Sequence, residues 1–254
     1  MNNAIDESGA VAGLDGMKIL ITGATTGIGR AAAILLVQNG ANVFIAGQTE
    51  EHLTDALESI SQLNPKGKYS GMVADVSTKE GIESLFAKAD ETLGSLDVLI
   101  NNAALAHGGA SDGEYDDWKR VVNTNLLGYI ACTRKAVDRM APNKRGHIIH
   151  IGSMSSDVRE KASSVYVATK AGIQGFAESL RKEVNELGVK ITLIEPGAVG
   201  TDMQPVSPPD QIEKQENMEM LKAEDIAAAI VYVLEQPFRC DVVEMKIKPH
   251  LQII

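Results

Sequence analysis

Tyr166 and Lys170 are the two side chains whose spacing points most directly to chemistry, and Ser153 precedes the tyrosine by 13 residues. Residues four apart share one face of a helix, so the phenol and the ammonium are expected to interact. A free phenol has a pKa near 10, and a nearby positive charge lowers it. A useful shift of two to three units needs roughly 3–4 kcal/mol of electrostatic stabilisation. We therefore expect Tyr166 to be a general acid or base with a depressed pKa; the alternative is an ordinary pair on a helix surface.

A glycine-rich segment near the start of the chain lies between an apolar, strand-like run and a helical pattern. It follows Lys18–Ile21 directly and reads Thr22-Gly23-Ala24-Thr25-Thr26-Gly27-Ile28-Gly29. Glycines let the backbone approach a pyrophosphate, and the first turn of the next helix offers free N–H groups and the positive end of its dipole. The segment predicts a dinucleotide site that includes Gly23, Thr25, Thr26, Gly27, Ile28 and Gly29.

The end of the second apolar run is where such a site normally contacts the ribose, about 20 residues further on. The chain there is Phe44-Ile45-Ala46-Gly47-Gln48-Thr49. It has neither the acid that binds the ribose hydroxyls of NAD nor an arginine for a 2′-phosphate. Gly47 leaves room without negative charge, while Gln48, Thr49 and Thr25 offer neutral hydrogen bonds. The missing acid favours NADP over NAD, which stays open as the alternative.

Together with further motifs, these residues resemble the short-chain dehydrogenase/reductase family over positions 17 to about 248. The motifs, in family order, are TGATTGIG at 22–29, Ala74-Asp75-Val76, Asn101-Asn102-Ala103, Asn123-Thr124-Asn125, Ser153, Tyr166 with Lys170, and Pro196-Gly197. The resemblance implies an oxidoreductase that interconverts a secondary alcohol and its carbonyl compound by hydride transfer with NAD(P). A nucleotide-binding regulator or scaffold of the same fold is the alternative from another class. The complete set Asn125, Ser153, Tyr166 and Lys170 favours the enzyme.

The resemblance also implies a role for each motif. Ser153 would polarise the substrate oxygen, Tyr166 would transfer the proton, and Lys170 would bind the nicotinamide ribose. Asn125 would hold a water that relays protons from Lys170, or else satisfy backbone groups in a kinked helix. Asp75 would contact the adenine, or else cap the helix at Lys79. The other implied cofactor contacts are Val76, Asn102, Ala103, Ala104, Pro196, Gly197, Val199 and Thr201.

Within the family, the segments Asn123–Gly128, Gly146–Ser153, Glu195–Gly200 and 241–249 resemble the branch that oxidises small 3-hydroxy acids such as serine. The segment Ser155–Ser164 borders the expected pocket, so Arg159 or Lys161 is a candidate to meet a substrate carboxylate; the alternative is an exposed charged loop. Ala104 and His150 replace a glycine and an asparagine that are usual in the family. These departures bear on substrate geometry more than on the chemistry.

The elements that position these residues alternate along the chain. Short β-branched runs predict strands at Met17–Ile21, Asn42–Ala46, Tyr69–Ala74, Leu96–Ile100, His147–Ile151, Lys190–Ile194 and Val242–Ile247. Helical periodicity predicts helices at Ile28–Gln38, Glu50–Gln62, Lys79–Thr92, Glu114–Met140, Ser164–Leu187 and Ala223–Leu234. We expect an α/β fold: one Rossmann-type domain over 17–254 with a doubly wound parallel sheet, after a flexible tail at 1–16. The proline-containing segment at about 198–220 is expected to form a substrate lid, or else a surface excursion.

Composition disfavours several classes of partner. The 254 residues carry a formal net charge of −10, unlike a nucleic-acid-binding protein. No apolar run reaches the length of a membrane span, and residues 1–16 lack the features of a signal peptide. Cys132 and Cys240 have no metal-ligand spacing, so we expect a cytoplasmic protein without a metal. Apolar surface on the helices around 126–140 and 164–187 predicts a symmetric homodimer or homotetramer that acts on a small molecule.

Overall fold

In the computed structural model, which describes residues 13–253, seven parallel strands form one sheet in the order β3-β2-β1-β4-β5-β6-β7. The strands are β1 (Lys18–Thr22), β2 (Asn42–Gly47), β3 (Tyr69–Val73), β4 (Val98–Asn101), β5 (Gly146–Ile151), β6 (Val189–Pro196) and β7 (Glu244–Ile247). Every residue of β5 and β6 is buried, and this includes polar side chains such as those of Lys190, Thr192 and Glu195.

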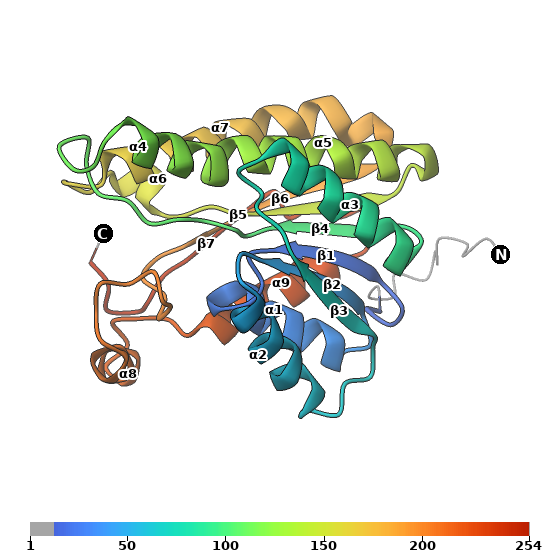
Figure 1. Cartoon of the computed structure of the whole chain (residues 1–254), viewed down its shortest axis with the longest axis horizontal. Coiled ribbons are helices and arrows are strands. Elements are labelled where there is room, and N and C mark those ends of the chain that lie inside the picture. The colour runs from blue at the N-terminus through green and yellow to red at the C-terminus, as the bar shows by residue number, and fades with distance from the viewer. Residues whose placement is uncertain (1–12, 254) are drawn as a thin grey trace.

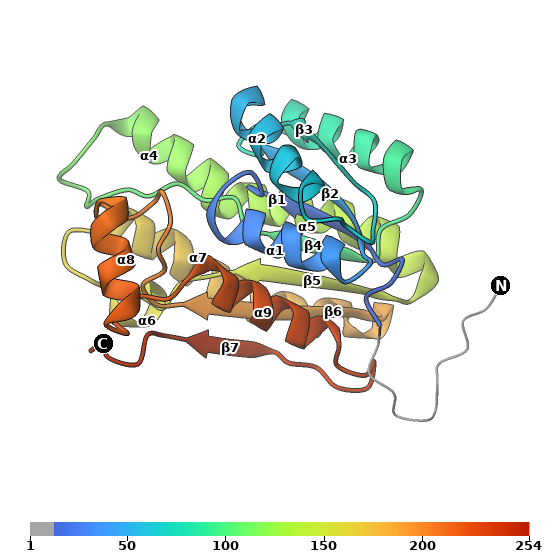
Figure 2. The ribbon, with the colours of Figure 1, turned by 90° about the horizontal axis from the view of Figure 1, so that it is seen from below.

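Helices cover both faces of this sheet (Figure 1). On one face lie α1 (Gly27–Gln38), α2 (Glu50–Ser61) and α9 (Ala223–Leu234), with α1 and α9 side by side (Figure 2). On the other lie α3 (Lys79–Leu93), α4 (Tyr115–Val122), α5 (Gly128–Met140) and α7 (Ser164–Val184). Alternate strand residues supply the two cores: Ile19 and Ile21 belong to the first, and Leu20 to the second.

The strand order reverses at β1, which lies between β2 and β4. Leu20 of β1 is in register with Phe44 of β2 on one side and with Leu99 of β4 on the other. Helices that follow the strands on either side of such a switch point diverge to opposite faces, which opens a crevice at the carboxyl ends of the strands. This crevice is where the glycine-rich turn lies.

The predicted α/β, doubly wound fold is confirmed, and most predicted elements end within two residues of the observed ones. The predicted helix over Glu114–Met140 contains one turn of π-helix, Asn123–Leu127, between α4 and α5. Two short helices were missed, α6 (Ser155–Val158) and α8 (Pro208–Glu216). In α8, Pro208 and Pro209 stand in the first turn and Ser207 caps it, so these prolines start a helix inside the predicted lid and do not break one.

The boundary of the predicted tail also needs correction. Residues 1–12 lie outside the described part of the chain. At the described end of the tail, Leu14 is buried and the Gly16 N–H donates to the Gly40 carbonyl oxygen at 3.0 Å. The domain therefore includes residues from Gly13 or Leu14 onward, because these contacts tie the start of β1 to the turn after α1.

Candidate active site

The turn between β1 and α1 is fixed in shape by contacts with the end of β4. Gly23 has φ of 62°, and a Cβ there would lie 2.5 Å from the Ala103 Cα. Asn102 Nδ2 donates to the carbonyl oxygens of Thr22 at 3.2 Å and Gly23 at 2.6 Å. Only glycine combines this left-handed backbone with so close an approach. The turn and the residues after β4 thus form one rigid cradle.

A cavity of about 290 Å³ opens beside this cradle. It brings together most of the predicted cofactor residues, namely Gly23, Thr25, Thr26, Gly27, Ile28, Gln48, Thr49, Val76, Asn102, Ala103, Ala104 and Thr201. Gly29, Asp75 and Val199 are not in its lining: Gly29 packs beneath the turn, and Asp75 accepts a hydrogen bond from the Ser77 N–H at 2.9 Å. Thr78, and not Asp75, caps α3.

Several residues that line this cavity were not predicted from the sequence as cofactor contacts, including His52, Thr124 and Asp202. His52 lies one turn into α2, and its N–H donates to Thr49 Oγ1 at 3.4 Å. His52 follows the predicted contact Thr49 by three residues and so lies on the same face of α2, which is the sequence signal that could have identified it. At Gly47 the structure has no room for a side chain, because a Cβ there would collide with Thr25. The first exposed side chain after β2 is therefore that of Gln48.

A second cavity, of about 640 Å³, contains the predicted catalytic hydroxyls. Ser153 and Tyr166 line it together with Pro196 and Gly197, which the sequence placed at the cofactor. The two cavities adjoin at Met203, which lines both. The arrangement therefore places the serine and the tyrosine next to the space beside the glycine turn.

Lys170 projects from α7 into the interior beneath Tyr166. Its Nζ donates to the Ile151 carbonyl oxygen at 2.9 Å and lies 5.7 Å from the centroid of the Tyr166 ring. The side chain is only 2% exposed, and burial lowers the pKa of Lys170 to about 8. Burial also raises the pKa of Tyr166, an effect that the hydrogen-bonding Ser153 hydroxyl partly offsets. For the protein chain by itself, burial thus dominates the Tyr166 pKa; the depressed pKa expected from Lys170 together with a cationic nicotinamide ring stays a prediction.

Asn125 stands in the π-helical turn and fastens the chain that follows β4. Its Nδ2 donates to the Leu105 carbonyl oxygen, its Oδ1 accepts from the Leu105 N–H, and both distances are 2.8 Å. Nδ2 also lies 3.4 Å from Thr169 Oγ1 on α7. Asn125 thus satisfies the backbone groups of Leu105, which lies after β4 and outside the irregular helix, and its role toward Lys170 stays a prediction.

Residues 17–212 match the family model described as short chain dehydrogenase. The chain belongs to this family. It is 34% identical over 231 residues to an uncharacterized oxidoreductase of Staphylococcus aureus (strain USA300), covering 91% of this chain and 96% of that protein. A Staphylococcus epidermidis oxidoreductase, also uncharacterized, is 32% identical over the same length. The crystal structure of an actinorhodin polyketide ketoreductase variant with NADPH superposes with a TM-score of 0.83 at 27% identity, covering 94% of this chain and 98% of that one.

This short-chain dehydrogenase is therefore an oxidoreductase of alcohol and carbonyl groups that uses a nicotinamide cofactor. In residues 13–253 no helix is long and apolar enough to cross a membrane.

Behind Ser153 the dehydrogenase has a buried carboxyl group that the motifs did not reveal. Ser156 Oγ lies 2.7 Å from the Ser153 carbonyl oxygen and 2.6 Å from Glu195 Oε1. A hydroxyl has one hydrogen and a carbonyl oxygen only accepts, so both short contacts hold a hydrogen only if Glu195 is protonated. Glu195 is fully buried, and burial raises the pKa of its carboxyl. Ser156 Oγ therefore links the Ser153 backbone to the buried Glu195 carboxyl, whose other oxygen lies 3.8 Å from Lys246 Nζ.

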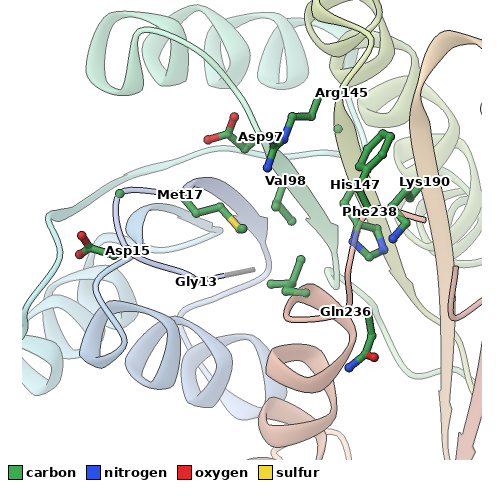
Figure 3. Close-up of a pocket in the computed structure, with 13 residues that line it drawn as sticks. Gly13, Asp15, Met17, Asp97, Val98, Arg145, His147, Lys190, Gln236 and Phe238 are labelled. Carbon is green, nitrogen blue, oxygen red and sulfur yellow. The ribbon is translucent and has the colours of Figure 1, made fainter. Parts of the chain in front are cut away.

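A third cavity, of about 360 Å³, lies at the opposite edge of the sheet, where the strands begin (Figure 3). His147, Lys190 and Phe238 lie together on one side of it. Lys190 Nζ donates to the carbonyl oxygens of Pro237 and Cys240 and lies 3.4 Å from an Asp241 carboxylate oxygen. None of the predicted site residues is found at this edge.

Proposed function

We propose that the protein interconverts a secondary alcohol and its carbonyl compound, with NADPH preferred over NADH. The observation that carries the proposal is the meeting of two cavities at Met203, one holding Ser153 and Tyr166 and the other the glycine turn. The NADPH in the ketoreductase neighbour and the absence of an acid at Gln48 both support this cofactor choice. Small 3-hydroxy acids are one candidate substrate class.

The cofactor supplies or accepts the hydride when it is bound. The residues proposed to hold it are the predicted set that lines the 290 Å³ cavity, with Lys170 at the nicotinamide ribose. Ser153 orients the substrate oxygen, and Tyr166 donates a proton to that oxygen during reduction or accepts one during oxidation. A positive charge on an oxidised nicotinamide would lower the Tyr166 pKa that burial raises. Asn125 and a water beside it are the proposed route by which Lys170 exchanges protons with solvent.

The test is Tyr166→Phe, which removes the transferable proton and keeps the ring. We expect kcat to fall by about 10²–10⁴-fold, the usual contribution of an acid–base group, while NADPH affinity changes little. Tyr232→Phe is the control, because Tyr232 is 52% exposed on α9, away from the site. Near-normal turnover in Tyr166→Phe contradicts the assignment. A protein that binds NADPH but turns over none of a panel of alcohols and carbonyl compounds is instead the silent regulator or scaffold.

The cofactor preference has its own test at Gln48. The exposed side chain at the end of β2 can be changed without the collision that a residue at Gly47 would make with Thr25. Gln48→Glu should lower kcat/KM for NADPH relative to NADH by about tenfold, because a carboxylate repels the 2′-phosphate. Gln48→Arg should move the ratio the other way. A wild-type enzyme that is faster with NADH contradicts the preference.

We further propose that the segment 198–220 is a lid. Its base is closed by backbone bonds from Leu221 N to Ala198 O at 2.8 Å and from Gly200 N to Leu221 O at 2.9 Å. The cavity of about 640 Å³ that holds Ser153 and Tyr166 is the proposed substrate cavity, and it is lined in part by Met203, Gln204 and Pro205 of this segment. Movement of these residues would open or close it. α8 stands beyond them, at the end of the sheet where the strands terminate (Figure 1).

A symmetric homodimer or homotetramer is the proposed assembly. Val122, Leu127 and Ile130, on consecutive turns from α4 to α5, are 40%, 52% and 38% exposed, which suits burial against a second copy. Light scattering should report a multiple of 27.1 kDa, and a stable species at that mass contradicts the proposal. The cytoplasm is the proposed compartment, and the two free cysteines, Cys132 and Cys240, support it.

A further inference from the structure

The lining of the substrate cavity includes one carboxylate, that of Glu160. In the described chain its ionisable side chains are His107, Glu160 and Tyr166, and no lysine or arginine is among them. Glu160 is held toward the Ser153 segment, since Ser155 Oγ donates to its Oε1 at 3.1 Å. Its negative charge reaches the phenol, where it helps to raise the pKa of Tyr166 after the larger effect of burial. The carboxylate therefore acts on the space where the substrate oxygen is activated.

The basic side chains nearest to this cavity have other partners. Arg159 Nε donates to the Ser156 carbonyl oxygen at 3.3 Å, and the residue is exposed and is not part of the lining. Lys246 lies against Asp157 and Glu244, the latter at 2.9 Å. Lys170 is buried beneath the Tyr166 ring and donates to the Ile151 carbonyl oxygen, and Lys248 Nζ donates to the Gln252 carbonyl oxygen at 2.9 Å. Lys161 is exposed and is not part of the lining. A carboxylate bound in the cavity would thus face the Glu160 carboxylate in the lining, with no lysine or arginine among the lining residues.

The rest of the lining is uncharged. Gln204 and Gln252 bring amide groups, and the Gln252 Oε1 already accepts from the Ala198 N–H at 3.0 Å. Met154, Met203 and Pro205 supply apolar surface. This mixture suits a neutral molecule with polar and apolar parts, or one with a positive charge that Glu160 can pair with.

We propose that Glu160 sets the charge specificity of this pocket, so that the enzyme takes neutral or cationic alcohol and carbonyl substrates and discriminates against carboxylates. The proposal rests on the proposed function, and it argues against the small 3-hydroxy acids that part of the sequence suggests. Unit charges about 6 Å apart at a partly solvated site repel enough to change a rate about tenfold. Glu160 is exposed, so salt will weaken the effect.

The experiment compares acetoacetamide with acetoacetate, which have nearly the same shape and differ by one negative charge. In the wild type, kcat/KM with NADPH should favour the amide by at least about tenfold at low salt. Glu160→Gln should remove most of this ratio by raising the value for acetoacetate. Glu160→Lys should reverse it. Glu178→Gln is the matched control, because Glu178 is an exposed carboxylate on α7 that pairs with Lys182 outside the cavity.

A second readout separates a direct charge effect from a general disturbance. Because Glu160 raises the pKa of Tyr166, Glu160→Gln should move the alkaline limb of the pH–kcat/KM profile for acetoacetamide to lower pH. A wild type that prefers acetoacetate, or a ratio that neither Glu160 variant changes, overturns the proposal while the proposed function stands. Failure of the proposed function looks different: no neutral, anionic or cationic carbonyl compound in the panel is reduced with either cofactor.

Discussion

The two ends of the sheet each place a buried lysine beside a cavity, and the surroundings of the two lysines differ. At the amino ends of the strands, Lys190 Nζ has two carbonyl oxygens, the Asp241 carboxylate and the Phe238 ring around it. At the carboxyl ends, Lys170 Nζ has one carbonyl oxygen, of Ile151, and two aromatic rings, those of Tyr129 and Tyr166. An ammonium has three donors, so Lys190 is satisfied while Lys170 keeps donors in reserve. The unused donors of the buried Lys170 ammonium suit it to bind a ligand, whereas the satisfied Lys190 ammonium suits a structural role.

The largest expected difference between the two ends comes from replacing each lysine by methionine. Lys170→Met should lower kcat by at least about 10²-fold, since it removes the cation proposed to bind the cofactor ribose and to supply protons. Stability at pH 7 should hold or rise, because burial lowers the Lys170 pKa to about 8 and its charged form is costly below that value. Lys190→Met should leave kcat within about threefold but lower unfolding free energy by about 1–3 kcal/mol, since its acceptors lose their donor.

Steady-state kinetics and urea unfolding of both variants provide the check. Equal losses of kcat in the two variants would contradict the assignment of a functional role to Lys170 and a structural role to Lys190.

The two ends should behave alike in a second test, which concerns the histidines of β5. His147, near the amino end, and His150, near the carboxyl end, are both buried, and burial lowers the pKa of each to about 3. An unfolded histidine titrates near 6.5, so between pH 6.5 and 3 the unfolded chain binds protons that the folded chain does not. Stability should therefore fall with pH across this window, by about 1.4 kcal/mol per unit for each histidine.

At pH 4.5 the cost is about 3 kcal/mol for each group. Urea unfolding at pH 7 and pH 4.5 measures it, and His150→Asn should remove about half of the combined effect of the two histidines. His250→Asn, at an exposed position near the end of the chain, is the control. An unchanged pH dependence in His150→Asn would mean that this ring is protonated in the folded protein.

A smaller effect is expected from the buried Glu195 carboxyl behind Ser153; among residues 13–253 no carboxyl group at the amino end of the sheet is buried. Glu195→Gln keeps a donor for Ser156 Oγ and should leave kcat within about threefold. Glu195→Leu removes the donor, loosens the Ser156 contact with the Ser153 carbonyl, and should lower kcat about tenfold. If Glu195→Gln is as slow as Glu195→Leu, the carboxyl is ionised and the inferred direction of these hydrogen bonds is wrong.

Local patterns predicted the strands and the site motifs because both depend on neighbours in sequence. The glycine turn needs Gly23 for its own backbone, and the spacing of Tyr166 and Lys170 follows from one helix. The partners that tune these residues come from far along the chain. Glu195 reaches Ser156 across 39 positions, and Lys170 turns to Ile151 across 19. No local pattern encodes which way a buried side chain points, so the pKa of Tyr166 and the charge of the pocket required the structure.

The last and smallest expected effect concerns the segment 203–218 at the carboxyl end and the segment 236–241 at the amino end. The first holds together through a few side-chain bonds, such as those from Gln211 Nε2 to Val206 O at 2.8 Å and to Thr201 O at 3.3 Å. Its helix α8 buries no residue, so it should open locally at low free energy without ligands. NADPH with an unreactive substrate analogue adds contacts at Met203 and Gln204, so hydrogen exchange in 203–218 should slow several-fold. The segment 236–241 lies at the other edge of the sheet, against Lys190, and its exchange should not change. Equal responses of the two segments would show a general stabilisation of the fold, and 203–218 would then be a surface excursion that does not close the pocket.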